Sequence, residues 1–269
     1  MKLVSSAKLR KAQNAIEAMR PYEEQLQGIL ASLQGGTAGV SSLNLGKNKD
    51  ERKTIVAIAS NSSLCGGFNA NAIAKVRAIR RPGDTVYAIG RKMADAMRKE
   101  GFASPEDFSA LSEHPSYGPA AALVEKLVAD VEAGRTGAVV LVYNHFVSTA
   151  RQEPVVEVLM QRETPDQVGG DRGVEERDSS PAPSYIAPLL EPSRAALLEA
   201  LVPKTRKLKL YAALLDSAAA EHAARTVAMQ TATDNAENLL SELTLQYNKG
   251  RQQKITSEIL DLAGGQAEN

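Results

Sequence analysis

The sequence from Lys204 to Leu262 reads KTRKLKLYAALLDSAAAEHAARTVAMQTATDNAENLLSELTLQYNKGRQQKITSEILDL. It contains no proline and one glycine, Gly250, and most positions hold the strong helix formers Ala, Leu, Glu, Lys, Gln and Arg. A continuous helix of this length would extend roughly 90 Å. That length exceeds the diameter of a domain of this size, so we predict a helix that projects out of its own domain.

The far part of this predicted helix has no clear core face. Residues 246–254 are almost wholly polar and lie between Leu245 and Ile255. Gly250, within this run, lowers helix stability by about 1 kcal/mol relative to alanine. Such a helix needs another surface to lie against, which is typical of a shaft or a scaffold rather than of an enzyme's interior.

A second helix is predicted at the other end of the chain, over residues 1–34, with a weak apolar stripe and an interruption or kink at Pro21. In the C-terminal segment, 193–269, Pro203 is expected to break or bend the helix. A row of alanines then recurs every four residues, which would let another helix approach closely: Ala220, Ala224, Ala228, Ala232 and Ala236. The simplest arrangement is an antiparallel coiled coil of the two terminal helices.

Between the terminal helices, residues 53–190 alternate strand and helix patterns. β-Branched and apolar runs predict strands at 54–59, 85–89, 138–143 and 154–161, and amphipathic runs predict helices at 69–79, 91–100 and 120–132. Connections rich in Gly, Ser and Pro are expected at 35–52 and 161–188. This alternation predicts an α/β domain with a mainly parallel sheet, inserted between the terminal helices.

Composition excludes several classes of protein. The 269 residues include 32 basic and 32 acidic side chains, and aromatic residues make up only 4%, so we expect no nucleic-acid partner. A single cysteine, Cys65, rules out an internal disulfide framework and suits a reducing compartment. No apolar run approaches the roughly 20 residues that span a bilayer.

No catalytic, metal or cofactor site is predicted. The three histidines lie in different segments, and we interpret His222 with Glu221 as a surface pair. Cys65 begins a glycine turn that follows a strand and opens a helix, but the turn lacks the GxGxxG spacing of a dinucleotide site, so we expect a structural turn around a buried thiol. Two alternatives remain: an α/β nucleotide-binding enzyme with helical arms, and a self-associating coiled-coil scaffold, whose heptads residues 246–254 would break.

Three groups of residues resemble the gamma subunit family of the F-type ATP synthase. They are MKLVSSAKLRKAQ at 1–13, LCGGFN at 64–69, and a C-terminal series comprising EHAARTVAM at 221–229, ATDNA at 232–236, LTLQYNK at 243–249, and then Arg251-Gln252 followed by Ile255, Thr256, Glu258 and Ile259. They occur at both ends and in the middle, so the resemblance covers essentially the whole chain. Met1 corresponds to an internal methionine of that family, which suggests a missing helix start, and Asn61-Ser62-Ser63 replaces a common Asp-x-Gly.

The resemblance implies a non-catalytic central rotor without a cofactor, whose antiparallel coiled coil stands inside a ring of α and β subunits. The α/β domain would hold the epsilon subunit and rest on the membrane c-ring, on the cytoplasmic side of a bacterial plasma membrane. The shaft would couple proton flow to ATP synthesis or hydrolysis. Implied contacts are Arg251, Gln252, Thr256 and Glu258 with the β-subunit catch loop, Lys8, Arg10 and Lys11 with acidic surfaces of β, and Glu191 with the c-ring.

Overall fold

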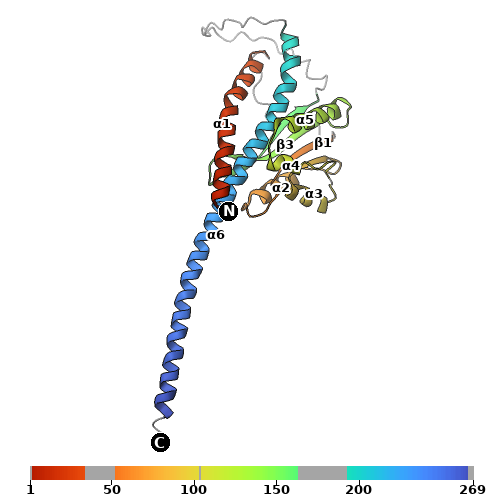
Figure 1. Cartoon of the computed structure of the whole chain (residues 1–269). Helices are drawn as coiled ribbons and strands as arrows, with labels where there is room; N and C mark the ends of the chain where they lie inside the picture. Colours follow the sequence, from red (N-terminus) through yellow and green to blue (C-terminus); the bar gives the residue numbers. More distant parts are fainter. Residues whose placement is uncertain (1, 34–51, 103, 163–192, 266–269) are drawn as a thin grey trace, which may run out of the picture.

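Two long helices lie side by side and carry an α/β domain on one flank (Figure 1). The computed structural model describes residues 2–33, 52–102, 104–162 and 193–265, with side chains as far as residue 260. Helix α1 spans Lys2–Leu33 and helix α6 spans Arg194–Gly265. The connections predicted at 35–52 and 161–188 lie almost entirely outside the described residues.

The domain is built on a four-stranded sheet in the order β2-β1-β3-β4. Strand β1 (Lys53–Ile58) pairs in parallel with β2 (Thr85–Ile89) and with β3 (Ala138–Phe146). Strand β4 (Gln152–Gln161) runs antiparallel to β3 and forms an edge of the sheet. It contains Pro154, and proline is tolerated in an edge strand because one side of that strand has no partner strand. The mainly parallel sheet predicted from the sequence is therefore confirmed.

Helices cover both faces of the sheet because β1 sends alternate side chains to opposite sides. On one face, α2 (Phe68–Ile79) and α3 (Arg91–Lys99) pack against Ile55 and Ala57. On the other face, α5 (Tyr117–Glu132) and α6 pack against Val56 and Ile58, with Leu210 of α6 fully buried. The long helix is thus part of the domain core. The short helix α4 (Ser109–Glu113) was not predicted, because five residues carry too little periodicity.

The two terminal helices form the predicted antiparallel pair. Leu9 of α1 packs against Ala219 and Ala223 of α6. The start of α1 lies farther along α6, where Lys2 and Leu3 share a groove with residues between 229 and 240. The predicted alanine row is divided between two neighbours. Ala220 and Ala224 pack against Cys65 and the first residue of α2, whereas Ala232 and Ala236 line the groove beside the start of α1.

Neither proline ends its helix, so the predicted interruption at Pro21 and break at Pro203 are wrong, while the alternatives of a kink and a bend stay predictions. Helix α1 continues through Pro21, and α6 continues through Pro203. A proline removes one backbone donor and frees one carbonyl four residues earlier, here Glu17 or Glu199. Both residues are exposed, so water can bond to the freed carbonyl groups.

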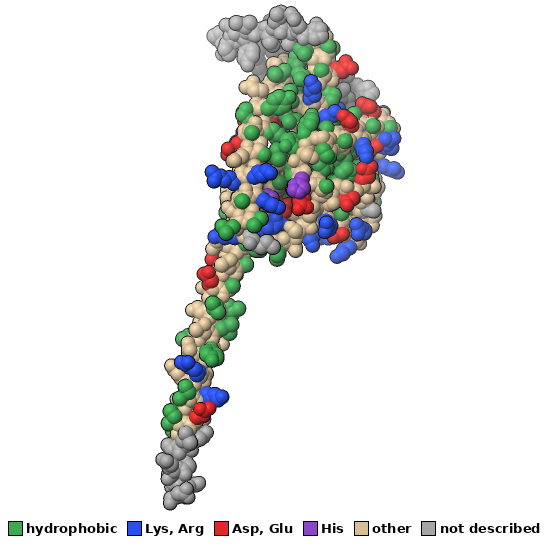
Figure 2. Space-filling view, viewed as in Figure 1, with side chains coloured by type: hydrophobic (Ala, Val, Ile, Leu, Met, Phe, Trp, Pro, Cys, Tyr) green, Lys and Arg blue, Asp and Glu red, His purple; other side chains and the backbone are tan. Residues whose placement is uncertain are grey.

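Past the groove that it shares with the start of α1, helix α6 projects away from the rest of the described structure. With 72 residues, α6 is about 110 Å long, whereas the 32 residues of α1 reach about 48 Å. Every residue from 231 to 260 is exposed. The chain therefore has a compact end and a projecting shaft, defined here as residues 231–260 (Figures 1 and 2). None of the described helices is long and apolar enough to cross a membrane.

Candidate functional site

The predicted catch-loop residues all lie on the projecting shaft. Arg251 and Glu258 are seven positions apart and share one face of the helix, because seven residues make nearly two turns. Gln252 and Thr256 lie on the neighbouring face, and the Thr256 hydroxyl donates a hydrogen bond to the Gln252 carbonyl oxygen at 2.8 Å. All four side chains are exposed. The structure thus presents them at a surface that an enclosing partner could reach.

The shaft also exposes apolar side chains, which were not among the contact residues predicted from the sequence. Large apolar residues flank or interrupt that run, with exposed fractions between 48% and 71%: Leu239, Leu240, Leu243, Leu245, Tyr247, Ile255, Ile259 and Leu260. Figure 2 shows apolar patches spaced along the shaft between polar ones. Exposed apolar surface of this extent marks a contact region in soluble proteins. Its signal in the sequence was leucine recurring within an otherwise polar helix.

The other predicted contact residues do not join this group. Lys8, Arg10 and Lys11 are exposed on α1. The Lys8 ammonium is close enough to lower the pKa of Glu221, which precedes Arg251 by 30 positions, or roughly 45 Å along α6. The basic face and the catch-loop residues are therefore separate surfaces. Glu191 lies outside the described residues.

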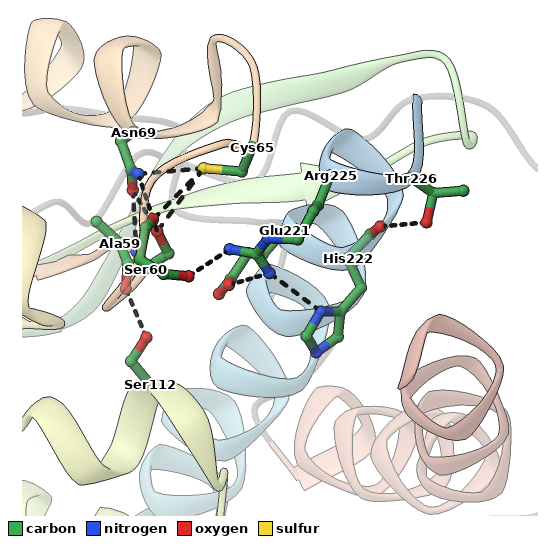
Figure 3. A network of polar contacts seen from close by, with 10 residues as sticks. Ala59, Ser60, Cys65, Asn69, Ser112, Glu221, His222, Arg225 and Thr226 are labelled. Carbon is green, nitrogen blue, oxygen red and sulfur yellow. Dashed lines mark hydrogen bonds and ion pairs between the residues drawn. The ribbon is translucent and has the colours of Figure 1, made fainter. Parts of the chain in front are cut away.

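Arg225 attaches α6 to the loop that follows β1 (Figure 3). Its Nη2 donates to the Ser62 hydroxyl at 2.7 Å, and its Nη1 lies 2.7 Å from the Glu221 carboxylate one turn earlier. The loop is braced in turn, since the Ser60 hydroxyl donates to the Ser62 carbonyl oxygen at 2.6 Å. By the resemblance, Ser62 corresponds to the middle residue of the family's common Asp-x-Gly, and here its hydroxyl connects the domain to α6.

The prediction of a surface pair at Glu221 and His222 is wrong. Glu221 is buried, with only 8% of its surface exposed, and His222 is half-buried. Burial raises the pKa of Glu221, although the Arg225 guanidinium opposes this. Burial also lowers the pKa of His222 to about 4, and the positive charges of Arg225 and Lys8 act in the same direction. His222 is therefore neutral at neutral pH, at the junction of α1, α6 and the domain.

This depressed pKa predicts an acid-sensitive junction. Between pH 6.5 and about 4, the unfolded chain protonates His222 while the folded chain does not, so the contribution of His222 to stability falls as the pH falls through that window. We expect His222→Gln to lose less thermal stability than the wild-type chain between pH 7 and 4.5. The exposed His114 gives the control, because His114→Gln should keep the wild-type pH dependence. Parallel pH profiles for wild type and His222→Gln would contradict this expectation.

A second attachment lies nearer the start of α6. The Asp216 carboxylate accepts a hydrogen bond from the Phe146 backbone N–H at 3.0 Å and lies 2.5 Å from Nδ1 of His145. Burial raises the pKa of Asp216, while its bonds to His145 and Phe146 act in the opposite direction. Nearly two turns earlier, the Lys209 ammonium donates to the Val158 carbonyl oxygen at 3.0 Å. Polar contacts thus bind α6 to β3 and β4 as well as to the loop after β1.

The turn after β1 is closed off by α6. Leu64 and Gly66 adopt positive φ angles of 66° and 57°, which turn the chain into α2. A side chain added at Gly66 would touch the β-carbon of Ala228 at 3.9 Å. Cys65 is 1% exposed, as expected for a buried thiol. Open α/β sheets bind ligands beyond the carboxyl ends of their strands, and at β1 that position is covered by the long helix. The described residues contain no cluster of metal-ligating side chains.

The α/β domain packs along one half of a long helix, and the exposed other half projects from it. This arrangement defines a stalk protein that carries a shaft. The family described as ATP synthase matches residues 1–267. The ATP synthase gamma chain of Phocaeicola vulgatus is 44% identical over 98% of this chain and 91% of its own length. That of Pelotomaculum thermopropionicum is 37% identical over 99% and 91%.

The fold agrees with a solved rotary complex. A chain in the mitochondrial ATP synthase structure of Euglena gracilis, which comprises OSCP, F1 and the c-ring, aligns with a TM-score of 0.64 at 20% identity, covering 97% of this chain and 94% of its own. The present chain therefore belongs to the ATP synthase gamma chain family, and it is a central stalk subunit of an F-type ATP synthase.

Proposed function

We propose that this chain is the rotor of its synthase and carries no catalytic residue or cofactor of its own. The observation that carries the proposal is the run of exposed residues from 231 to 260, which projects from a domain firmly bound to the same helix. A single asymmetric shaft on the axis of a ring of identical sites makes those sites inequivalent. Each shaft orientation then favours a different state at each site, provided that its contacts differ between the states.

The proposal assigns partners to the two ends of the molecule. The shaft stands inside a ring of α and β subunits, where Arg251, Gln252, Thr256 and Glu258 meet a loop of β and the apolar side chains meet the surrounding ring. Lys8, Arg10 and Lys11 face acidic surfaces of β. The domain end holds the epsilon subunit and rests on the c-ring, with Glu191 at that contact. The chain thereby lies at the cytoplasmic face of a bacterial plasma membrane, which it meets only through the complex.

The structure supports a mechanical role for the polar attachments. Torque that enters at the domain end must reach the shaft through the contacts between the domain and α6. These comprise the apolar core around Leu210 and Leu214 and the side-chain bonds of Lys209, Asp216 and Arg225. Their distribution over several turns of α6 resists both sliding and rotation of the helix against the sheet. We propose that proton flow through the c-ring turns this rigid unit and so drives ATP synthesis.

Observation of rotation tests the rotor assignment. Because Cys65 is buried, a second cysteine introduced by Lys99→Cys, at an exposed position on α3, can be labelled selectively. The labelled chain is assembled with α and β subunits, which are immobilised, and a probe on the new cysteine is followed with and without ATP. We expect ATP-dependent rotation in one direction. An active assembly whose probe stays fixed would exclude the rotor assignment, and saturable binding of ATP or NAD by the isolated chain would favour the nucleotide-binding alternative.

The catch-loop assignment predicts a coupling defect in a double variant. Replacing Arg251 and Gln252 together by alanine should leave the isolated fold intact, since both side chains are exposed. In the assembled complex we expect ATP-driven proton pumping to fall about tenfold, because charged hydrogen bonds to the partner are lost. The matched control is Gln253→Ala with Lys254→Ala, which likewise removes one amide and one cation but at adjacent positions outside the assigned group. Unchanged pumping in the first variant would refute the assignment.

A further inference from the structure

A small hollow opens at the end of the sheet where strands β1 and β3 begin and strand β4 finishes. Its volume is about 320 Å³, and its lining comprises Arg52, Gly134, Arg135, Thr136, Gly137 and Arg162. Backbone bonds hold these segments together, because the Gly137 N–H donates to the Arg52 carbonyl oxygen at 2.9 Å and the Arg162 N–H donates to the Gly137 carbonyl oxygen at 2.8 Å. Three arginines from three separate segments therefore surround one hollow, which we name the arginine pocket.

The charge of this pocket is unbalanced among the described residues. None of the described residues that line it is acidic. Arg135 bonds to Asp130 through Nε at 2.8 Å and through Nη2 at 2.5 Å, which leaves its Nη1 available. Within the described part of the chain, the side chains of Arg52 and Arg162 make no hydrogen bond or ion pair. Like charges that share a site repel one another, so the arrangement is unfavourable until an anion enters.

Local backbone geometry keeps the hollow open. Gly134 has a φ of +72°, and a β-carbon there would lie 3.4 Å from Nη1 of Arg162. The absence of a side chain at this turn therefore leaves the guanidinium groups accessible.

The pocket lies at the end of the domain remote from the shaft. Along α6, Lys209 contacts β4, Asp216 contacts the end of β3, and Arg225 contacts the loop after β1. The helix thus runs toward the carboxyl ends of β1 and β3 and leaves the domain there. Arg52 and Thr136 precede the opposite ends of the same strands.

We propose that the arginine pocket binds a phosphate group, carried either by the headgroup of an anionic phospholipid or by free inorganic phosphate. Guanidinium groups match phosphate oxygens with paired donors, and three of them can neutralise a doubly charged phosphate. The lipid source rests on the proposed function, which places this end of the domain toward the membrane ring. Binding of free phosphate does not depend on it.

Two probes, applied to the isolated full-length chain, test the proposal and separate its sources. Thermal unfolding is followed with inorganic phosphate and with sodium chloride at equal ionic strength. Co-flotation is measured with vesicles of phosphatidylcholine, alone or mixed with phosphatidylglycerol. The pocket variant is Arg52→Gln with Arg162→Gln. The charge-matched control is Arg98→Gln with Lys99→Gln, two exposed cations at the end of α3.

We expect the wild-type chain and the control to respond to phosphate, to anionic vesicles, or to both, and the pocket variant to bind roughly tenfold more weakly. A response to vesicles alone identifies the lipid headgroup as the source, and a response to phosphate alone identifies the free ion. Without any anion, the pocket variant should be at least as stable as wild type, because two repelling charges are gone. A wild-type chain indifferent to both probes, or equal losses in pocket variant and control, would overturn the proposal.

Discussion

Replacing Arg225 by methionine should lower the free energy of unfolding by about 3 to 5 kcal/mol, because the change leaves a buried carboxylate without its cation. The side chains of Arg225 and Glu221 are only 13% and 11% exposed, so water does little to compensate. The bond to Ser62 is lost in the same change. Calorimetry of the isolated chain measures the effect. If the partner charge is the cause, Glu221→Gln in the same chain should restore much of the lost stability.

The sign of the pH dependence gives an independent check on this variant. Arg225 lowers the pKa of Glu221 against the larger effect of burial. Without Arg225, the folded chain holds the carboxyl proton to a higher pH while the unfolded chain is unaffected. The stability that the variant loses relative to wild type should therefore be smallest in acid. It should grow as the pH rises toward the higher pKa that Glu221 has in the folded variant. Arg151→Met, which removes an exposed partner of Glu153, should change stability by less than about 1 kcal/mol.

Gly90→Ala should destabilise the domain by about 3 kcal/mol or more, because backbone strain and a steric clash add together. Gly90 joins β2 to α3 with a φ of +103°, and a β-carbon there would lie 2.1 Å from the Ala59 carbonyl oxygen. That oxygen also accepts the Ser112 hydroxyl at 2.6 Å, so moving it would break a buried bond. Urea unfolding monitored by circular dichroism measures the loss.

Gly28→Ala provides the comparison for this glycine. Gly28 lies inside α1, and a β-carbon there would meet nothing within 4 Å. Alanine favours a helix over glycine, so the substitution should stabilise the chain by up to about 1 kcal/mol. If Gly90→Ala and Gly28→Ala behaved alike, close backbone contact would not be the reason for the glycine at position 90.

The division of α6 into an attached half and a bare half has a functional consequence. Near Leu210 the helix belongs to the domain core, whereas every described residue from 231 to 260 is exposed and only the first part of that stretch lies beside the start of α1. A shaft that was flexible at its base would store torque as bending and deliver it poorly. The buried pair of Glu221 and Arg225 lies just before the helix becomes free, where such stiffness matters most.

Local regularity explains which parts of the fold could be predicted. The strand at 85–89 matches its prediction at both ends, because a β-branched, buried run is a short-range pattern. The continuity of α6 was partly missed at Pro203, since the cost of a proline depends on whether water reaches the freed carbonyl. The contact residues on the shaft came from a resemblance to a family rather than from any pattern of spacing.

The sequence by itself determined that a helix too long for its domain ends the chain, and that a mainly parallel sheet precedes it, because propensity and periodicity act over short distances. Only the tertiary structure decided what that helix touches. It showed that Glu221 is buried against Arg225, that alanines at 220 and 224 face the domain, and that arginines 52, 135 and 162 share one hollow. Those facts depend on groups far apart in the chain, whose burial and charge are set only when the elements pack.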